Sequence, residues 1–458
     1  MRISRRSLRA RVKGSLPVRF TDEKLTSYGG LELIRQFLRS SGFLARLKEV
    51  FAVREFDTDY GSYRMALGLI GMLIVGGSRL HHLRLLAHDP LILRFAQLTR
   101  LPDIRTISRW LGSLTEGVRE RISVLMREVA YESARLAGVT RATLELDGTV
   151  LRTGLCAEGA ERGFNPHHPK DKSYYPLTAH LAQTGQLLEI RNRPGNVHDS
   201  RGAVEMLRAL VTDLREALGR IPIEVRLDGA FFQAPILRFL ADSGVEYALK
   251  VPMWKWLELR RPIAQRKRWT RIAPRLCAFS MQLSVPKWGI TQRVVVYRKH
   301  VSGKTRKNFQ LDLFTPDDGH YEYSVVATNK SLAPAALWDF MAGRGGHEKT
   351  LGELKTHLAF DTIPAQDWDA NCAWQLLVGL THNLIRHFQL STTAVKRPKG
   401  RKRTTLFVMQ TLRTLRFELI NVPARLARPQ GREELRIAAA PATRLRYQAT
   451  LESLDRAA

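Results

Sequence analysis

The sequence predicts an α/β protein in which a mixed sheet flanked by helices follows a helical N-terminal region and precedes a helical C-terminal region. Two patterns support this class. From about residue 22 to residue 137, leucines and isoleucines recur every three to four positions, which is the period of a helix with one buried face. From residue 143 onward, apolar and polar residues alternate over short segments, as in strands, and helical stretches separate these segments.

The composition limits the class of protein and of partner. With 458 residues, 44% hydrophobic and 25% charged, the chain is long enough for two or three domains with ordinary cores. Lysines and arginines number 73 against 43 acidic residues, so the net charge is +30. DNA is the expected partner, because phosphate contacts release counterions and attract basic proteins, and an anionic membrane surface is the weaker alternative.

The expected location is intracellular. No run reaches the ~18 to 20 apolar residues that a membrane span needs, and the most apolar stretch, Met65 to Gly77, is predicted to be a buried helix. The three cysteines lie far apart without metal-ligand spacing, which fits a reducing compartment. We therefore expect a cytoplasmic, nucleoid-associated protein without a membrane partner. The basic first 13 residues are interpreted as a DNA-contacting arm rather than an organellar transit peptide.

A helix–break–helix unit is predicted in the N-terminal region. The first helix covers residues 90–99 and is capped by Asp89, and the second covers residues 104–114 and is capped by Asp103. In the second helix Arg105 and Arg109 face away from the apolar stripe, as the contact residues of a recognition helix in a major groove do. The alternative is an ordinary packed pair of helices.

The elements from residue 143 follow the order strand, hairpin, helix, strand, helix, strand. The expected segments are 143–149, 174–182 with 186–191, a helix capped by Asp199 or Ser200 to about 218, 221–228, 230–243 and 245–251. This is the order of elements in a ribonuclease-H-like fold, where the first strand lies beside the strand that follows the first helix.

Both of these neighbouring strands end in Leu-Asp-Gly, which places Asp147 and Asp228 at strand ends. Adjacent strands lie ~4.8 Å apart, so the two carboxylates can hold one metal ion between them. A single aspartate at a strand end is more simply a turn residue. Two in the same motif and topology favour a functional site.

Residues 252–330 depart from the core pattern. A basic run from Arg260 to Arg275 leads into strand-like segments at 277–285, 292–301, 309–314 and 321–328, which predict a β-rich insertion. Lys287 and Trp288 combine a cation with an aromatic ring, which suits stacking on displaced bases. The alternative is that the tryptophans cover the core of the insertion.

A third carboxylate lies in the polar stretch from Arg344 to Lys355. Ser331 is expected to cap a helix that continues into it, and at about 100° per residue Arg344, Glu348 and Lys355 share one helix face. Alone, this pattern is typical of an exposed ion-pair ladder. With the two strand-end aspartates, Glu348 becomes the expected third ligand of a two-magnesium site, and the two cations become phosphate contacts.

Four motifs together carry a resemblance to a known family: Leu146-Asp147-Gly148-Thr149, Gly195-Asn196-Val197-His198-Asp199-Ser200, Arg226-Leu227-Asp228-Gly229-Ala230-Phe231 and Arg344-x3-Glu348-x6-Lys355. Over about residues 141–390 the chain resembles bacterial insertion-sequence transposases of the Asp-Asp-Glu type, which have a β-strand insertion before the Glu. The resemblance implies that the triad binds two magnesium ions, for which manganese can substitute. It also implies cleavage at the element's ends and joining of the freed 3′-OH to target DNA. Met341 stands where the family usually has Tyr, so a phosphate contact from a tyrosine hydroxyl is not expected.

The expected organisation has five parts. These are a helical DNA-binding region (1–140), the first part of the core (141–251), the insertion (252–330), the second part of the core with the Glu348 helix (331–392), and a basic linker with a helical C-terminal region (393–458). In the last two parts, long helices are expected at 368–390 and 406–426, and the basic run 396–403 is either a solvated linker or a phosphate contact.

The function expected from these observations is that of a DNA transposase. It would bind terminal inverted repeats and target DNA, and it would act as a homodimer in the DNA complex because two ends are joined. Two alternatives remain: a catalytically silent, transposase-derived DNA-binding protein, and a metal-dependent nuclease that hydrolyses without joining.

Overall fold

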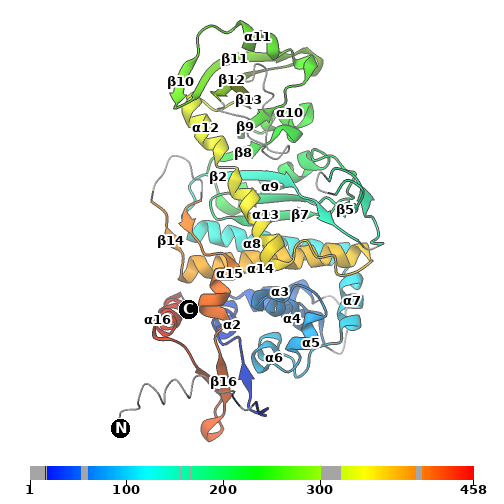
Figure 1. The fold of residues 1–458 in the computed structure, drawn as a ribbon, viewed down its shortest axis with the longest axis vertical. Coiled ribbons are helices and arrows are strands. Elements are labelled where there is room, and N and C mark those ends of the chain that lie inside the picture. Colours follow the sequence, from blue (N-terminus) through cyan, green and yellow to red (C-terminus); the bar gives the residue numbers. More distant parts are fainter. Residues whose placement is uncertain are drawn as a thin grey trace.

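The structure is a computed structural model that describes residues 16, 18–52, 60–154, 156–165, 168–300, 321–398 and 405–457. Three expectations lie outside the described residues: the basic N-terminal arm, the strand at 309–314 and most of the basic run at 396–403. A nine-stranded mixed sheet forms the middle and upper part of the molecule in Figure 1, and the N-terminal helices lie below it. Among the described residues, no helix is both long and apolar enough to cross a membrane.

The N-terminal region is helical, as predicted. Its helices are α2 (Leu31–Ser40), α3 (Phe43–Val50), α4 (Ser62–Val75), α5 (His82–Leu86), α6 (Pro90–Ala96), α7 (Ile104–Ser113) and α8 (Glu116–Leu136). The apolar stretch forms α4, which is buried from Met65 to Val75. Asp89 accepts hydrogen bonds from the backbone N–H groups at the start of α6, and Asp103 accepts one at the start of α7, so both predicted caps are confirmed.

The core sheet has the predicted topology. Five strands lie in the order β7 (Gln186–Arg191), β6 (Leu177–Leu181), β2 (Ala142–Gly148), β8 (Ile223–Leu227) and β9 (Glu246–Val251). β2, β8 and β9 are parallel, and β6 is antiparallel to its two neighbours. The first strand therefore lies beside the strand that follows the first helix of the core, as in a ribonuclease-H-like fold.

The two faces of this sheet differ in chemistry. Apolar residues such as Leu146 and Leu227 pack against α9 (Ala203–Leu218) and α10 (Ala234–Asp242). On the opposite face the alternate residues of the same strands are polar, and Glu145, His180 and Arg226 are fully buried there. Strand alternation predicted one apolar face, but polar residues on the other face would ordinarily be solvated. Here a later pair of helices covers them.

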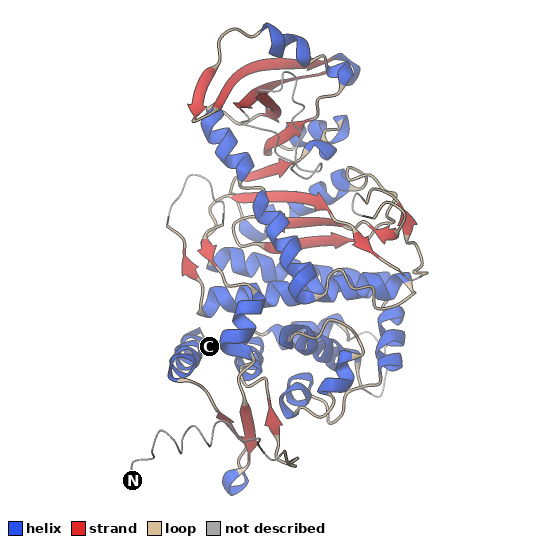
Figure 2. Cartoon of the chain, in the orientation of Figure 1, coloured by secondary structure: helices blue, strands red, loops and turns tan. Residues whose placement is uncertain are grey.

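The strands of the insertion continue the core sheet. β13 (Tyr321–Thr328) pairs antiparallel with β9, and β12 (Ile290–His300), β11 (Leu276–Val285) and β10 (Thr270–Ala273) follow outward from it. The described part of the insertion thus forms the upper half of one continuous sheet (Figure 2). It also contains α11 (Arg260–Gln265), and Trp269 packs on Phe279 inside this layer, with ring centroids 4.8 Å apart.

The helix expected from Ser331 through Lys355 is two helices. α12 (Pro334–Ala342) begins after Ala333, not after Ser331, and α13 (Gly345–Leu358) begins after a break that contains Arg344. Glycines at 343, 345 and 346 explain the break, because glycine is a poor helix former. The two helices cross in front of the polar face of the sheet in Figure 1.

Other departures are local. The predicted strand at 174–182 is divided between β5 (Lys172–Tyr174) and β6, with Pro176 in the gap, because proline cannot donate a ladder hydrogen bond. β5 forms a small separate sheet with β3 (Leu151–Arg152) and β4 (Glu161–Arg162). α9 begins at Ala203 after Gly202, so Asp199 and Ser200 do not cap it.

The C-terminal part contains the predicted long helix, α14 (Trp368–Thr392), which packs on β7, α7 and α8. The helix expected at 406–426 is wrong. That range contains β15 (Phe407–Val408), α15 (Leu412–Leu415), a short π-helix η5 (Arg416–Ile420) and β16 (Ala424–Ala427). Pro423 disfavours helical backbone at the residue before it. β15 pairs with β14 (Val395–Lys396), β16 pairs with β1 (Leu25–Thr26) and with β17 (Glu434–Ile437), and α16 (Pro441–Ala457) contacts α2.

Candidate active site

Asp147 and Asp228 are brought to the same end of the sheet by strand register. In the parallel β2–β8 pair, Ala142 lies opposite Ile223 and Glu145 lies opposite Arg226, an offset of 81 residues. Two residues beyond the last of these pairs, the same offset sets Asp147 opposite Asp228. Asp147 is in β2 and Asp228 follows β8, where its side chain accepts a hydrogen bond from the N–H of Ala230. Both side chains lie on the polar face that α13 covers.

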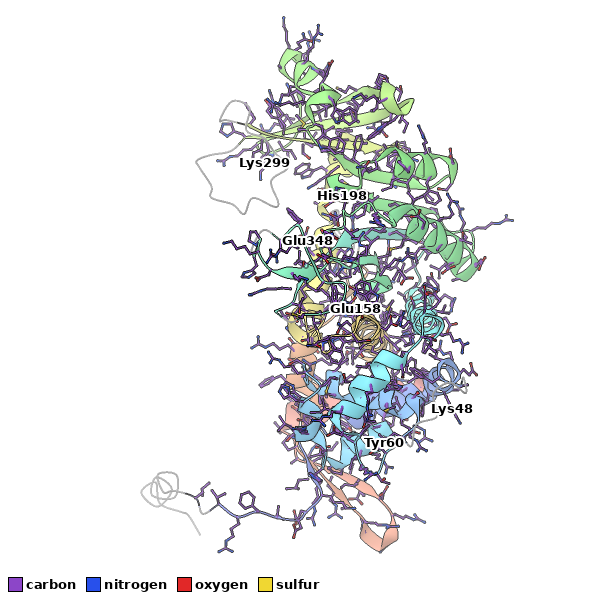
Figure 3. The ribbon with its side chains drawn as sticks, turned by 90° about the vertical axis from the view of Figure 1, so that its right-hand side faces the viewer. Lys48, Tyr60, Glu158, His198, Lys299 and Glu348 are labelled. Carbon is purple, nitrogen blue, oxygen red and sulfur yellow. The ribbon has the colours of Figure 1, made fainter. Side chains whose placement is uncertain are left out.

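Arg344 links these two aspartates to Glu348. Its Nη2 lies 3.1 Å from an oxygen of Asp147 and 3.1 Å from an oxygen of Asp228, and its Nη1 lies 3.7 Å from Glu348 Oε1. The Arg344 side chain is largely buried, whereas the Glu348 side chain is about half exposed. Figure 3 labels Glu348, which lies one turn into α13. The structure therefore brings all three predicted carboxylates around one cation. Arg344 lies in the break between α12 and α13 and points toward the two aspartates, and the phosphate contact expected of it stays a prediction.

The negative charge of this cluster shifts the pKa values of its members. Burial raises the pKa of Asp147 to about 7, Arg344 opposes that shift, and the nearby carboxylates add to it. The carboxylates in turn raise the pKa of the Arg344 guanidinium further, although its own burial acts in the opposite direction. Four acidic groups lie near two largely buried cations, Arg344 and Arg193, so the negative charge of the site is only partly neutralised.

Asp199 is the fourth acidic group, and sequence reasoning did not identify it as a site residue. Its Oδ2 accepts a hydrogen bond from the Tyr175 hydroxyl at 3.1 Å, and its Oδ1 lies 3.9 Å from Arg193 Nη2. A Cβ on Gly148 would lie only 2.1 Å from Asp199 Oδ1, which shows how closely Asp199 approaches the end of β2. The signal was present, because Asp199 belongs to one of the four motifs, but it was interpreted as a helix cap.

The other residues of the Arg344–Lys355 stretch are placed as follows. Lys355 donates from Nζ to the backbone oxygen of Val150 at 2.9 Å, just beyond β2, and burial lowers its pKa. Glu353 lies on the side of α13 opposite Arg344 and Lys355, as its position in the helix predicts. It accepts a hydrogen bond from Arg386 on α14 at 2.6 Å. Met341 packs in an apolar cluster between α12 and the sheet, so this position serves the core.

The remaining predicted contact residues lie outside the carboxylate cluster. Arg105 and Arg109 are exposed on α7, opposite the buried Ile107 and Leu111. A cleft of about 990 Å³ lies between α7 and the C-terminal part of α13. Residues that line it include Ile104 and Ser108 of α7, the basic residues Arg79, Arg152, Lys355 and Arg416, and one acid, Asp361.

Lys287 and Trp288 lie in the turn between β11 and β12, within an aromatic group that the sequence did not reveal. Trp288 contacts Phe232, four residues after Asp228, with ring centroids 5.1 Å apart. Trp256, which is 41% exposed, stacks on Trp254 at 5.5 Å, and Lys287 Nζ lies 5.6 Å from the centre of its ring. Trp288 thus covers part of the core and also borders an exposed aromatic surface.

The donor set fits a divalent metal ion. Asp147 and Asp228 share one positively charged partner at equal distances, so their oxygens can converge on one ion, and Glu348 reaches the same partner. Magnesium prefers oxygen ligands and keeps several waters or substrate oxygens, and three carboxylates on an open edge of a sheet leave room for them.

Comparison with known proteins identifies the family of the chain. No curated protein matches the chain. A solved cryo-EM structure described as a piggyBac transposase synaptic complex with hairpin DNA is similar with a TM-score of 0.39 and 13% identity, covering 86% of this chain and 80% of that chain. At that distance nothing about the site is transferred from it. The family described as Transposase DDE domain group 1 matches residues 9–458, nearly the whole sequence, and the chain therefore belongs to this family of DDE transposases.

Proposed function

We propose that this transposase binds the terminal inverted repeats of a bacterial insertion sequence and catalyses strand cleavage and strand transfer with Asp147, Asp228 and Glu348. The observation that carries the proposal is the meeting of these three carboxylates around Arg344, two from neighbouring strand ends and one from α13. An exposed ion-pair ladder on a single helix, the alternative for Arg344 and Glu348, would not include the two aspartates.

In this proposal the three carboxylates hold two magnesium ions, for which manganese can substitute. Two such ions supply electrostatic stabilisation of the attacking and leaving oxygens in an in-line displacement at phosphorus. Glu348 is the most exposed of the three and therefore faces the side from which DNA enters.

Arg344 changes partner in the working complex. Without metal it neutralises Asp147 and Asp228. With cations bound at the carboxylates, the guanidinium would be available for charge-assisted hydrogen bonds with a DNA phosphate near the scissile bond. Lys355, which lies next to the end of β2, is the second candidate phosphate contact.

DNA recognition is assigned to α7 and the cleft beside it. Arg105 and Arg109 are exposed and available for contacts with the terminal repeat, and the cleft lined by Arg79, Arg152 and Lys355 leads from α7 toward the carboxylates. Lys287 and Trp288, with the exposed Trp256, are placed to stack on an unpaired base near Asp228. Joining two ends requires two copies of the chain in the DNA complex, so we propose a homodimer there.

The test is cleavage and joining of DNA that carries the inverted repeats flanking the gene. Asp147→Asn, Asp228→Asn and Glu348→Gln should each reduce the cleavage rate about 10³-fold or more, because each removes a charged ligand without changing side-chain size. Binding of the repeats, measured at fixed salt, should change less than about threefold. Asp242→Asn, at the exposed end of α10, is the matched control and should cleave normally.

The same assay separates the alternatives. A wild-type protein that binds the repeats but does not cut them with magnesium or manganese would be a silent DNA-binding protein. Cleavage without covalent joining to a target plasmid would identify a nuclease. If one of the three variants cuts at the wild-type rate, that residue does not belong to the triad.

A further inference from the structure

A buried polar network lies directly beneath the carboxylates. Glu145 precedes Asp147 by two residues on β2, and Arg226 precedes Asp228 by two residues on β8, so each partner points to the same face as its aspartate. Arg226 Nε donates to Glu145 Oε1 at 2.5 Å, and both side chains are fully buried. Arg226 also donates to the backbone oxygen of Phe340 in the last turn of α12, where helix carbonyls favour a cation.

The helix α13 joins this network through His347, the residue before Glu348. His347 is fully buried, and its ring stacks on His180 of β6, with centroids 4.7 Å apart and planes 14° apart. His180 Nδ1 lies 3.1 Å from Glu145 Oε2. The catalytic helix is thus fixed to the sheet by polar contacts rather than by apolar packing alone.

A second metal site is the first interpretation to consider, because Glu145, His180 and His347 offer ligand atoms within 4.8 Å of one another. Two features oppose it. Glu145 already has a buried cationic partner in Arg226. The lone pair of an imidazole nitrogen lies in the plane of its ring, so two rings stacked nearly parallel cannot direct lone pairs at one ion.

The hydrogen-bond directions instead define a chain from α13 to β2. The Thr178 hydroxyl lies 3.0 Å from the backbone oxygen of Asp147 and 3.0 Å from His347 Nε2. A backbone oxygen can only accept, so the single hydroxyl proton of Thr178 goes to Asp147, and His347 Nε2 must carry the proton that Thr178 accepts. The chain therefore runs His347 Nε2–H to Thr178 hydroxyl to Asp147 carbonyl.

We propose that His347 and Thr178 are positioning residues that set α13, and with it Arg344 and Glu348, relative to Asp147. The chain connects the residue adjacent to the third carboxylate with the backbone of the first, across two elements that are 200 residues apart in sequence order. Arg344 precedes His347 by three residues and Glu348 follows it, so a shift of His347 moves both. The inference rests on the proposed function, since it explains how that site is assembled.

Four variants at Thr178 and His347 test this chain of hydrogen bonds. Thr178→Val removes the hydroxyl but keeps size and branching, and Thr178→Ser keeps the hydroxyl. His347→Leu removes the donor, and His347→Gln returns an N–H near the position of Nε2. Thr143→Val is the matched control, because Thr143 is equally buried on β2 and also donates a buried hydrogen bond, to Glu224, away from α13.

Four quantities are measured on the full-length protein: Mn²⁺ affinity without DNA, kcat and KM for cleavage of end DNA, and the melting temperature. Thr178→Val and His347→Leu should weaken Mn²⁺ binding and lower kcat about 10- to 100-fold, the usual effect of losing a group that orients a ligand. KM for DNA should change less than kcat, because the proposed contacts of Arg79 and Arg105 with the repeat lie outside α13. Thr178→Ser and His347→Gln should recover most of the loss, and the double variant should be no worse than either single one.

The outcomes are distinct. Thr143→Val should lower the melting temperature while leaving Mn²⁺ affinity unchanged. Wild-type Mn²⁺ affinity in Thr178→Val and His347→Leu, or equal loss in Thr143→Val, would show that the chain only stabilises the fold and would refute this inference. If the wild-type protein itself bound no Mn²⁺ and cut no DNA, the proposed function would fail, and the inference with it.

Discussion

Arg344 controls the charge balance of the carboxylate site. Its guanidinium lies 3.1 Å from an oxygen of Asp147 and 3.1 Å from an oxygen of Asp228, so in the proposed mechanism it would compete with a metal ion for the same carboxylates. The competition has a use: buried carboxylates that face one another without a counter-charge repel strongly, and an internal cation limits that cost until metal and DNA arrive. The same side chain would then serve the DNA phosphate.

This competition predicts the effect of neutralising Arg344. In Arg344→Gln, Mn²⁺ affinity of the DNA-free protein should rise about tenfold, because loss of one close positive charge is worth at least ~1.4 kcal/mol in such a site. The cleavage rate with DNA should fall, because the phosphate contact is lost. Isothermal titration and single-turnover cleavage measure the two effects. Arg344→Lys keeps the charge and should stay near wild type in Mn²⁺ affinity, whereas weaker Mn²⁺ binding in Arg344→Gln would contradict the competition.

At the scale of elements, glycines decide how the site is built. Gly148 ends β2 beside Asp199 and Tyr175, and a Cβ there would lie 2.1 Å from Asp199 Oδ1 and 2.6 Å from the Tyr175 ring. Gly346, in the first turn of α13, has open space where a Cβ would be. The first glycine is needed for close approach, and the second only weakens the helix locally.

Alanine substitutions at Gly346 and Gly148 should therefore change the free energy of unfolding in opposite directions. Gly346→Ala should stabilise the protein by about 0.5–1 kcal/mol, because alanine is the better helix former and nothing obstructs its methyl group. Gly148→Ala should destabilise it by about 1–3 kcal/mol, the usual cost of overpacking, and should displace Asp199. The melting temperature should rise in Gly346→Ala and fall in Gly148→Ala when both are measured beside the wild type. A stable Gly148→Ala variant would mean that Asp199 can move away freely.

The sequence predicts those elements whose pattern lies within one short segment. β2 and β8 show clean alternation, and the helices α6, α7 and α14 begin at Asp89, Asp103 and near Asp367, so these elements were identifiable. The break before α13 was missed because the spacing of Arg344, Glu348 and Lys355 continues an unbroken helical pattern through three glycines. Asp199 was missed because its contacts with Tyr175 and Gly148 cross the sheet.

Long-range pairing was beyond the sequence altogether. The insertion strands were identified individually, but whether β13 pairs with β9 or closes a separate sheet depends on which edge is free, and no local pattern encodes that choice. The burial of Glu145 and Arg226 was equally hidden, because alternation on a strand does not reveal that another element covers the polar face. The placement of Asp147 beside Asp228 was predicted from the Leu-Asp-Gly motif at two strand ends and from the element order, and the register of β2 and β8 agrees with it.

At the scale of the whole molecule, the N-terminal and C-terminal regions pack against each other and against α14. β1 pairs with β16, α16 contacts α2, and Arg416 of the C-terminal part donates to backbone oxygens of α4 and of α13. The N-terminal helices are thereby held against the end of the catalytic helix. The cleft between α7 and Lys355 has walls from both regions, and the proposed function makes it the path of a DNA end from α7 toward the carboxylates.

That route predicts which basic residues contribute to binding of the repeat ends. Arg79→Ala, in the cleft, and Arg105→Ala, on α7, should each weaken binding and reduce the slope of log K against log salt by about 0.9, the effect of one lost phosphate contact on duplex DNA. Arg220→Ala is the control, because Arg220 is exposed at the opposite end of β8 from Asp228. Fluorescence anisotropy with repeat DNA at several salt concentrations gives both quantities. If Arg79→Ala and Arg220→Ala change the slope equally, the net charge of +30 attracts DNA without a defined path, and the cleft is not its route.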